Sequence, residues 1–232
     1  MPKKQQFQAI RIHKMKARTR RASIGGFPPT EPNAAFINIP YDKTYEPLYL
    51  AFIAGLSGFG LLPRAVLQIP GSQRRLDRIL KLMCICRYSF HDISQVTLDT
   101  RRPPTPRFNM PFELGLAVAW QKAGDRKHRW FIFESRNHRQ QKSLSDLNGT
   151  DIYIHDGRPI GVFRELTNAL ARTKHRPTVK ELQAIYRDIR KASVKIKRNL
   201  AARTLLETRP FQELVMAARI SAKRRIASLR AS

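Results

Sequence analysis

Three short segments of the chain hold polar and charged side chains beside apolar runs, and side chains in such places can do chemistry. Together the segments contain Asn38, Tyr41, Asp42, His91, Asp92, Ser94, Arg107, Asn109 and Glu113. Two of these side chains, Asp92 and Glu113, are carboxylic acids in different sequence surroundings. Such a pair suits general acid–base or nucleophilic catalysis, because different environments can hold one group protonated and the other ionised.

The apolar pattern around these segments predicts strands that alternate with helices. Strands are expected at 34–39, 61–68, 88–93, 129–134 and 151–155, and helices at 48–58, 72–86, 111–122 and 160–172. The helix at 72–86 has Leu76, Ile79 and Met83 at helical spacing, with arginines on its other faces. This alternation predicts an α/β fold, a Rossmann-like or flavodoxin-like three-layer sandwich with a mostly parallel sheet.

The predicted sheet would bring the three polar segments together. Ligands of open parallel sheets bind beyond the carboxyl ends of the strands. The segments that follow Ile39, follow Phe90 and precede Phe112 all fall at such ends. We therefore expect one binding site that takes residues from all three.

The same segments resemble a known family. The runs FINIPYD at 36–42, HDIS at 91–94 and FNMPFELGLA at 108–117 are similar to those of the nucleoside 2-deoxyribosyltransferase-like group and, more distantly, of TIR-type domains, over roughly residues 34–170. The resemblance implies that Glu113, in its E-L-G-x-A motif, is the nucleophile. It also implies that Asp92 binds the nucleoside and manages the proton of the leaving base.

The chemistry implied by this resemblance is cleavage of an N-glycosidic bond. One carboxylate stabilises or traps an oxocarbenium-like state while an acid protonates the departing base. Arg107 would bind a 5′-phosphate and so favour nucleotides over nucleosides. Asn38, Tyr41, Asp42, His91, Ser94 and Asn109 complete the predicted substrate-binding set.

Each of these residues also has a plainer interpretation. If Pro111 is the first helical residue, Glu113 occupies N3, where glutamate is favoured for capping. Asp92 could close an Asx turn, Tyr41 and Asp42 could belong to an ordinary turn, and His91 could be a packing residue. Gly115 argues against pure capping, since a glycine inside a helix costs about 1 kcal/mol and suggests a close approach.

The net charge of +27 is concentrated toward the ends of the chain. Residues 1–32 hold 8 Lys and Arg against 1 acid, residues 33–172 hold 20 against 12, and residues 173–232 hold 16 against 4. We predict a basic N-terminal arm at 1–32, an α/β domain at 33–172 and a basic helical extension at 173–232. Such flanks attract nucleic acid or another anionic partner, or are solvated tails.

The C-terminal extension is predicted to contain two amphipathic helices. Thr178 and Glu181 form the pattern of a capping box at the start of the first, and Pro210 marks the start of the second. Together they would form a hairpin that packs on the core, on a partner or on a second copy of the chain.

Several classes of protein are disfavoured by composition and motif. There is no apolar run long enough to span a bilayer, and residues 1–21 lack the features of a secretory signal, so a cytoplasmic protein without membrane contact is expected. Cys84 and Cys86 are expected to be core residues, with neither a disulfide nor a metal site. No glycine fingerprint or phosphate-binding loop occurs, and no cofactor is predicted.

Three hypotheses remain at this point. The first is a hydrolase or transferase of N-glycosidic bonds acting on a nucleotide, a deoxynucleotide or nicotinamide dinucleotide, with an effector of antiviral defence as a TIR-like variant. The second is a non-catalytic protein that senses a nucleotide or binds nucleic acid through its basic flanks. The third is a structural subunit whose basic helices dock on an acidic partner or on RNA.

Overall fold

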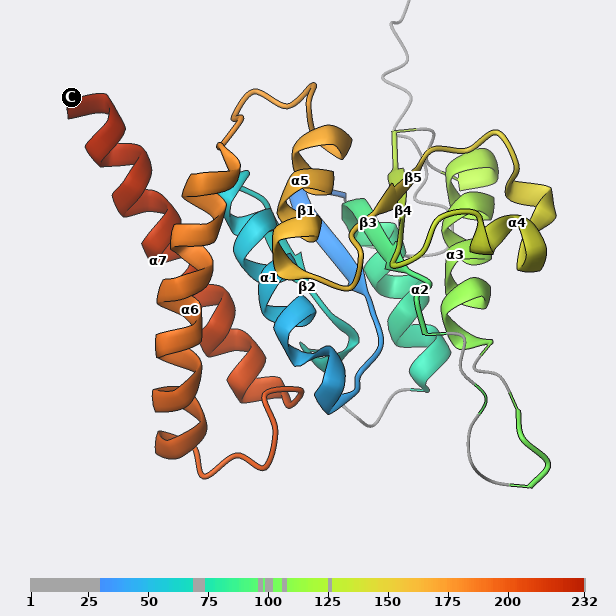
Figure 1. Cartoon of the computed structure of the whole chain (residues 1–232), viewed down its shortest axis with the longest axis horizontal. Helices are drawn as coiled ribbons and strands as arrows, with labels where there is room; N and C mark the ends of the chain where they lie inside the picture. Colours follow the sequence, from blue (N-terminus) through green and yellow to red (C-terminus); the bar gives the residue numbers. More distant parts are fainter. Residues whose placement is uncertain are drawn as a thin grey trace, which may run out of the picture.

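The computed structural model describes residues 30–68, 74–95, 98, 102–105, 108–124 and 127–231, with the side chains of the last helix described as far as residue 225. Figure 1 shows its strands and helices in chain order. The strands are β1 (Glu31–Asn38), β2 (Leu62–Arg64), β3 (Cys86–Asp92), β4 (Arg129–Glu134) and β5 (Ile152–Ile154). The helices are α1 (Glu46–Gly58), α2 (Arg75–Ile85), α3 (Asn109–Ala119), α4 (Arg139–Ser143), α5 (Pro159–Ala169), α6 (Val179–Asn199) and α7 (Thr208–Ala231).

The five strands form one sheet in the order β2-β1-β3-β4-β5, and every described pair is parallel. This is the flavodoxin-like order, in which the chain first builds toward one edge and then returns to build toward the other. The predicted α/β sandwich is therefore confirmed. Its direction of growth reverses between β1 and β3, so the carboxyl ends of these two strands are where such a sheet offers room for a ligand.

Helices cover both faces of the sheet (Figure 1). On one face, α1 and α5 pack with β1, β3 and β4 around the largest apolar cluster, which includes Phe52, Phe90 and Phe133. On the other face, α2 and α3 pack in two smaller clusters with Phe36 and Ile132. The interior is thus divided by the sheet, as the three-layer arrangement requires.

The last two helices extend the first of these layers outward. Residues of α1 are buried without interruption from Leu48 to Gly58, because the sheet lies on one side of the helix and α6 and α7 lie on the other. Leu182 of α6 and Phe211 of α7 are buried in the same cluster as α1. Gly58 leaves room for this packing, since a Cβ at that position would lie 2.4 Å from Leu182 Cδ2. Of the alternatives for the hairpin, packing on the core is the one observed.

The predicted elements differ from the observed ones mainly at their ends. Residues 66–68 of the predicted second strand form a 3₁₀ turn, and the polar stretch before Leu147 contains the short helix α4, which was not predicted. Residues 31 and 32 of the predicted N-terminal arm belong to β1, and residues 1–29 lie outside the described residues. Cys84 and Cys86 are buried, as expected of core residues, and both thiols are free. Among the described helices, none has the length and apolar character needed to cross a bilayer.

Candidate functional site at the carboxyl edge of the sheet

Polar side chains stand at the carboxyl ends of four neighbouring strands. Asn38, Asp92 and Glu134 are the last residues of β1, β3 and β4, and His155 directly follows β5. All four are buried, with exposed fractions of 1% or less. Because burying polar groups is unfavourable unless they are hydrogen-bonded, each needs partners at this edge.

Asp92 is enclosed by three hydrogen-bond donors. Its Oδ1 accepts the backbone N–H of Ser94 at 2.9 Å, and its Oδ2 accepts the hydroxyl of Tyr45 and Nε2 of His155, the latter at 3.0 Å. The bond to Ser94 is the Asx turn that the plainer interpretation of Asp92 predicts. Asp92 thus ties together the ends of β3 and β5 and the 3₁₀ turn before α1.

His155 is held in a defined tautomer by a tight turn. The N–H of Gly157 donates to Nδ1 at 3.1 Å, so the proton of the neutral ring is on Nε2, where it can be donated to Asp92. Asp156 and Gly157 both have positive φ, and the N–H of Arg158 donates to His155 O, which defines a type I′ turn. No side chain at position 161 could fit here, since a Cβ on Gly161 would lie 2.0 Å from His155 O.

Glu134 forms a second buried acidic group beside the first. Arg139 pairs with it through Nε at 3.0 Å and through Nη2, and the backbone N–H of Ser135 donates to Oε1. Nη2 of Arg139 also donates to the carbonyl oxygen of Ser94 at 2.6 Å. This arginine therefore connects the ends of β3 and β4 and neutralises the carboxylate that the fold buries there.

Glu113 lies in the second turn of α3, not at a capping position. The helix begins at Asn109 with Phe108 as its N-cap residue, so Glu113 is the fifth helical residue, past the N3 position that would make it a capping group. The capping interpretation is wrong because the helix starts two residues earlier than Pro111. The side chain nevertheless points inward, with only 2% of the residue exposed.

Burial and weak ion pairing raise the pKa of Glu113. Its ion-pair partner among the described residues is Arg75, whose Nη2 lies 3.9 Å from Oε1 and whose side chain is 49% exposed. Burial raises the pKa of the Glu113 carboxyl to about 7, and the charge of Arg75 only partly opposes this rise. At neutral pH the group is therefore poised between its acid and its carboxylate form.

Tyr41 completes the surroundings of Glu113. Its buried hydroxyl lies near the backbone of Val66, and the guanidinium of Arg75 lies over its ring at 5.8 Å from the centroid. Burial and then the neighbouring Glu113 raise the pKa of the phenol well above its usual value. The predicted substrate-binding residue Tyr41 and the predicted nucleophile Glu113 therefore share one environment.

The two predicted catalytic carboxyl groups have different neighbours. Within the described residues, no side chain is hydrogen-bonded or ion-paired to both Asp92 and Glu113. They are related through the segment that follows β1, in which Tyr41 lies near Glu113 and Tyr45 binds Asp92. Asp92 is thus a satisfied group, whereas Glu113 is the less well satisfied of the two.

Asn38 and His91 were predicted to bind substrate, but the structure places them inside the protein. Asn38 Nδ2 lies 3.0 Å from His91 Nδ1, and His91 Nε2 lies 2.9 Å from Ser89 Oγ. The chain of hydrogen bonds continues from Ser89 to His128 Nε2, and His128 Nδ1 donates to the carbonyl oxygen of Cys86. With both histidines neutral, each group in this series of hydrogen bonds can donate its proton to the next one, from Asn38 to the carbonyl oxygen of Cys86. Since these polar atoms are hydrogen-bonded to other residues of the protein, Asn38 and His91 have a structural role in the core.

The burial of His91 predicts how stability depends on pH. Burial and the neighbouring His128 lower the pKa of His91 from 6.5 to about 3. The unfolded chain therefore binds the proton first, and the free energy of unfolding falls as pH drops from 6.5 toward 3, by roughly 1.4 kcal/mol per pH unit. Urea unfolding of wild type and of His91→Gln between pH 6.5 and pH 4 checks this. The two curves should converge as pH falls, whereas parallel curves would show that His91 has the same pKa in the folded and the unfolded chain.

Of the remaining residues predicted to bind substrate, some lie at the carboxyl edge of the sheet and others do not. Asp42 caps the 3₁₀ turn Lys43–Tyr45, with its Oδ1 accepting from the N–H and the hydroxyl of Thr44. The hydroxyl of Ser94 lies 3.1 Å from His155 Nε2, so this residue belongs to the Asp92 group. Asn109 is exposed at the first turn of α3, and Arg107 lies outside the described residues.

Gly115 does not mark a close approach within the described part of the protein. It is exposed, and a Cβ built on it would meet no described atom within 4 Å. We therefore expect Gly115→Ala to stabilise the protein by about 1 kcal/mol, because alanine favours the helix. Thermal unfolding should show a midpoint about 2–4 °C higher. A more stable variant that binds ligand poorly would mean that the glycine is kept for a ligand or partner.

Tyr45, Glu134, His155 and Arg139 were not among the residues predicted for this site. Glu134 and His155 could have been found by the rule that identified Asp92, because each follows an apolar strand directly. Tyr45 and Arg139 carry no comparable signal. Their roles depend on where the chain turns after β1 and β4, and local sequence does not determine those directions.

Comparisons of the chain with protein-family models, with curated proteins and with solved structures found no match. Within the described residues, no group of three or more His, Cys, Asp or Glu side chains is placed to hold a metal ion. The chemistry of this edge must therefore be judged from its own side chains, of which Arg75 is half-exposed and lies beside the buried Glu113 and Tyr41.

Proposed function

We propose that the protein binds a nucleotide-like molecule at the carboxyl edge of β1 and β3 and cleaves its N-glycosidic bond with Glu113. The observation that carries the proposal is the state of this side chain, which is almost fully buried, has no capping function and has a pKa of about 7. A carboxyl group that costs stability in this way is expected at a functional site more often than in a core. The E-L-G-x-A resemblance supports the same residue.

The proposed reaction has two steps. An oxygen of the ionised Glu113 attacks C1′ of the sugar as the C1′–N bond breaks, and the base leaves with the bonding electrons. A purine or pyrimidine base then takes a proton from water and leaves hydroxide, whereas nicotinamide leaves as a neutral molecule. Water, or a second base, then attacks C1′ of the glycosyl ester, the C1′–O bond to Glu113 breaks, the carboxylate is released, and the nucleophile loses a proton to hydroxide or to solvent. Hydrolysis and transfer differ only in which nucleophile completes the second step.

The proposal gives the neighbouring residues separate tasks. Arg75, whose side chain is 49% exposed, would bind a phosphate of the substrate, while its positive charge favours the ionised form of Glu113. Tyr41, with its pKa raised, remains a neutral hydrogen-bond donor. Asp92 has three donors already, so our proposal uses it to hold the edge together, and the acid role that the resemblance implies is not needed.

The direct test is release of a free base. Purified full-length protein is incubated with ribonucleotides, deoxynucleotides and nicotinamide dinucleotide, and the products are separated by liquid chromatography. Release from one class identifies the substrate, and release that rises with pH around 7 would agree with ionisation of Glu113. Absence of base from all three classes, at enzyme concentrations comparable to substrate, would remove the proposal.

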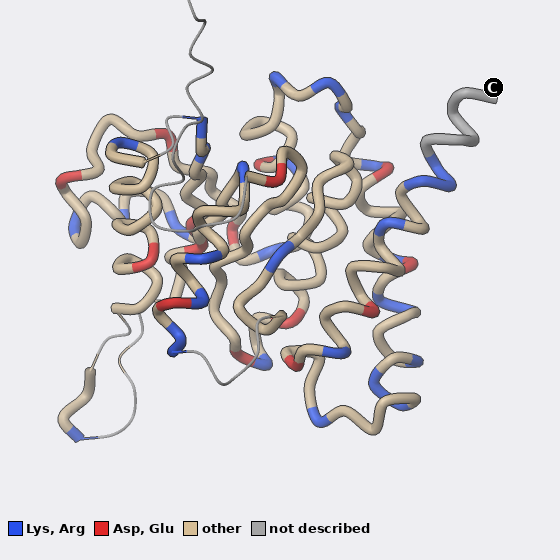
Figure 2. Tube along the Cα trace, turned by 180° about the vertical axis from the view of Figure 1, so that it is seen from behind, with Lys and Arg blue, Asp and Glu red and all other residues tan. Residues whose placement is uncertain are grey.

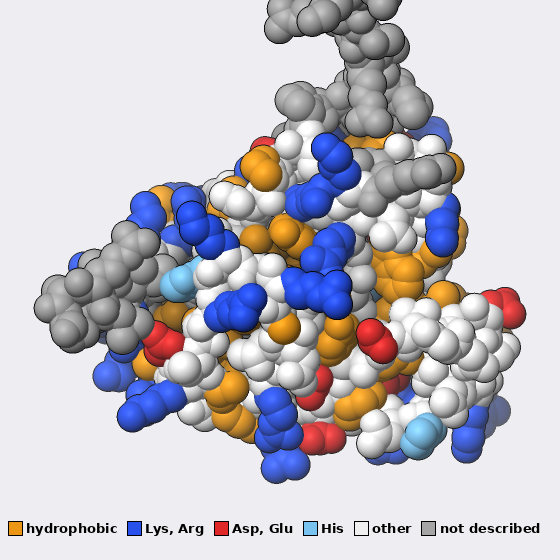
Figure 3. Space-filling view, turned by 90° about the horizontal axis from the view of Figure 1, so that it is seen from above, with side chains coloured by type: hydrophobic (Ala, Val, Ile, Leu, Met, Phe, Trp, Pro, Cys, Tyr) orange, Lys and Arg blue, Asp and Glu red, His pale blue; other side chains and the backbone are white. Residues whose placement is uncertain are grey.

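A second candidate function is supported by the distribution of charge. Residues 179–225 contain 13 Lys and Arg against 4 acids, and Figure 2 shows the basic residues spaced along α6 and α7. Basic side chains are also spread over the face seen in Figure 3. A non-catalytic protein that binds a nucleotide at the sheet and nucleic acid through these charges would bind RNA or DNA with a steep dependence on salt. Filter binding at several salt concentrations measures this dependence and so tests the non-catalytic function separately from base release.

A further inference from the structure

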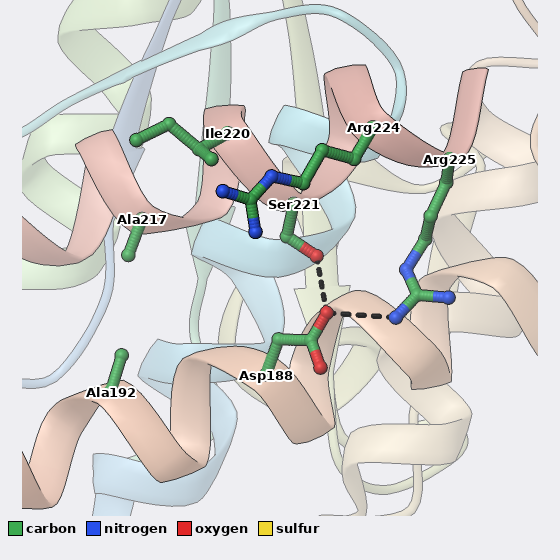
Figure 4. Close-up of a pocket in the computed structure, with 7 residues that line it drawn as sticks. All are labelled: Asp188, Ala192, Ala217, Ile220, Ser221, Arg224 and Arg225. Atoms are coloured by element: carbon green, nitrogen blue, oxygen red, sulfur yellow. Dashed lines mark hydrogen bonds and ion pairs between the residues drawn. The ribbon is translucent and has the colours of Figure 1, made fainter. Parts of the chain in front are cut away.

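A groove lies between the outer sides of α6 and α7, away from the carboxyl edge of the sheet. It has a volume of about 610 Å³, and Figure 4 shows the side chains around it. Asp188 and Ala192 of α6 form one wall, and Ala217, Ile220, Ser221 and Arg224 of α7 form the other. The small side chains of Ala192 and Ala217 keep the helices' facing sides open, which creates the space.

The single acidic residue of this groove is already neutralised. Asp188 Oδ2 accepts the hydroxyl of Ser221 at 2.6 Å and Nη2 of Arg225 at 2.7 Å, as the dashed lines in Figure 4 indicate. Partial burial opposes ionisation, but these two hydrogen bonds, together with the charges of Arg225 and Lys191, lower the pKa of Asp188. Asp188 therefore closes one end of the groove as a bound carboxylate and is not available to a ligand's cations.

Further basic side chains lie in and near the groove. The guanidinium of Arg224 extends over the groove between Ala217 and Ser221 in Figure 4, and no ion pair of Arg224 is found among the described residues. Lys191 and Lys195 lie three and seven residues after Asp188, on the same side of α6. An incoming carboxylate would thus meet Arg224 on α7 and the positive charges of Lys191 and Lys195 on α6.

Large apolar side chains are exposed next to these charges. Ile220 is 45% exposed and Met216, one turn earlier, is 58% exposed. A second depression of about 290 Å³ lies beside them, lined in part by Val215, Arg219 and Lys223, and Ile220 borders both spaces. Exposed apolar residues ringed by basic ones are typical of a protein interface, where methionine and arginine are enriched.

We infer that this groove docks an acidic amphipathic helix of a partner protein. The apolar face of such a helix would cover Ile220, Met216 and the alanines, and its carboxylates would pair with Arg224, Arg219 and Lys223. Nucleic acid would satisfy the charges but would leave the apolar side chains exposed. A second copy of this chain, at +27, and its own basic N-terminal segment would both bring like charges to the groove.

The inference can be tested with a designed probe. The probe is a fluorescein-labelled peptide of 18 residues with leucine at i, i+4, i+7 and i+11 and mainly glutamate between them, and the full chain is titrated into it while anisotropy is followed. We expect saturable binding that Ile220→Glu weakens by about tenfold or more. Arg224→Glu should weaken it too, with a reduced dependence on salt.

The matched control is Val194→Glu. Val194 is 70% exposed on α6 but lies two residues from Ala192, on another side of that helix, so this variant should bind the peptide like wild type. Equal binding of a scrambled peptide of the same composition would overturn the inference, as would an unchanged affinity in both Ile220→Glu and Arg224→Glu. Binding of an 18-nucleotide RNA but not of the peptide would assign the surface to nucleic acid instead. None of these readouts depends on release of base.

Discussion

Replacing Glu113 by glutamine is expected to reduce base release by on the order of 10³-fold or more, because the amide cannot attack C1′ and form the glycosyl ester. The assay is the chromatographic measurement of free base under single-turnover conditions, with enzyme in excess over substrate. Glu213→Gln, an exposed change on α7, is the control that should retain full activity. Equal rates in Glu113→Gln and wild type would exclude Glu113 as the nucleophile.

The same substitution should also make the protein more stable above neutral pH. A carboxyl group whose folded pKa is raised from 4.5 to about 7 stabilises the fold fully below pH 4.5 and loses that contribution as pH rises through 7. Glutamine stays neutral, so at pH 8 we expect the free energy of unfolding of Glu113→Gln to exceed that of wild type by up to about 3 kcal/mol. Loss of activity together with gain of stability is typical of a residue kept for function. Urea unfolding at pH 5 and at pH 8 measures the difference.

Removing the Asp92 carboxylate should have the opposite effect on stability. In Asp92→Ala the hydroxyl of Tyr45 and Nε2–H of His155 lose their acceptor inside the protein. We expect the free energy of unfolding to fall by about 3–5 kcal/mol, and the thermal midpoint by at least about 6 °C. Thermal unfolding followed by circular dichroism checks this.

The control for Asp92 is Asp151→Ala, since Asp151 is exposed just before β5. It should leave the thermal midpoint nearly unchanged. An unchanged midpoint in Asp92→Ala as well would mean that the three-donor arrangement does not form in solution. Asp92→Asn adds a further distinction, because a stable variant without base release would restore the acid role that the family resemblance implies.

Local patterns predicted most of the fold. The strand at 129–134 was placed at its observed ends, and the capping box at Thr178 gave the start of α6 to the residue, because these signals depend on neighbours in sequence. The apolar spacing in α2 worked for the same reason. The helix α4 was missed because its five residues are polar and held by Arg139, whose pairing with Glu134 is a tertiary contact.

The candidate site was predicted less completely than the fold. The rule about strand ends identified Asp92, and the motif identified Glu113, but neither could say whether the side chains would be satisfied. His91 precedes Asp92 in β3 and looked equally available. Both side chains are buried, but alternate residues of a strand point to opposite faces, and His91 lies on the face covered by α2 and α3, where its ring nitrogens are bonded to Asn38 and Ser89.

The sequence by itself determined the alternation of strands and helices, the excess of basic residues toward the ends and the types of side chain at each strand end, because these depend on composition and short-range spacing. Only the tertiary structure decided which carboxyl group is enclosed by donors and which remains poised near neutral pH. The physical reason is that acidity depends on burial and on the distance to partners, and segments far apart in the chain, such as Tyr45, Arg75 and His155, supply both.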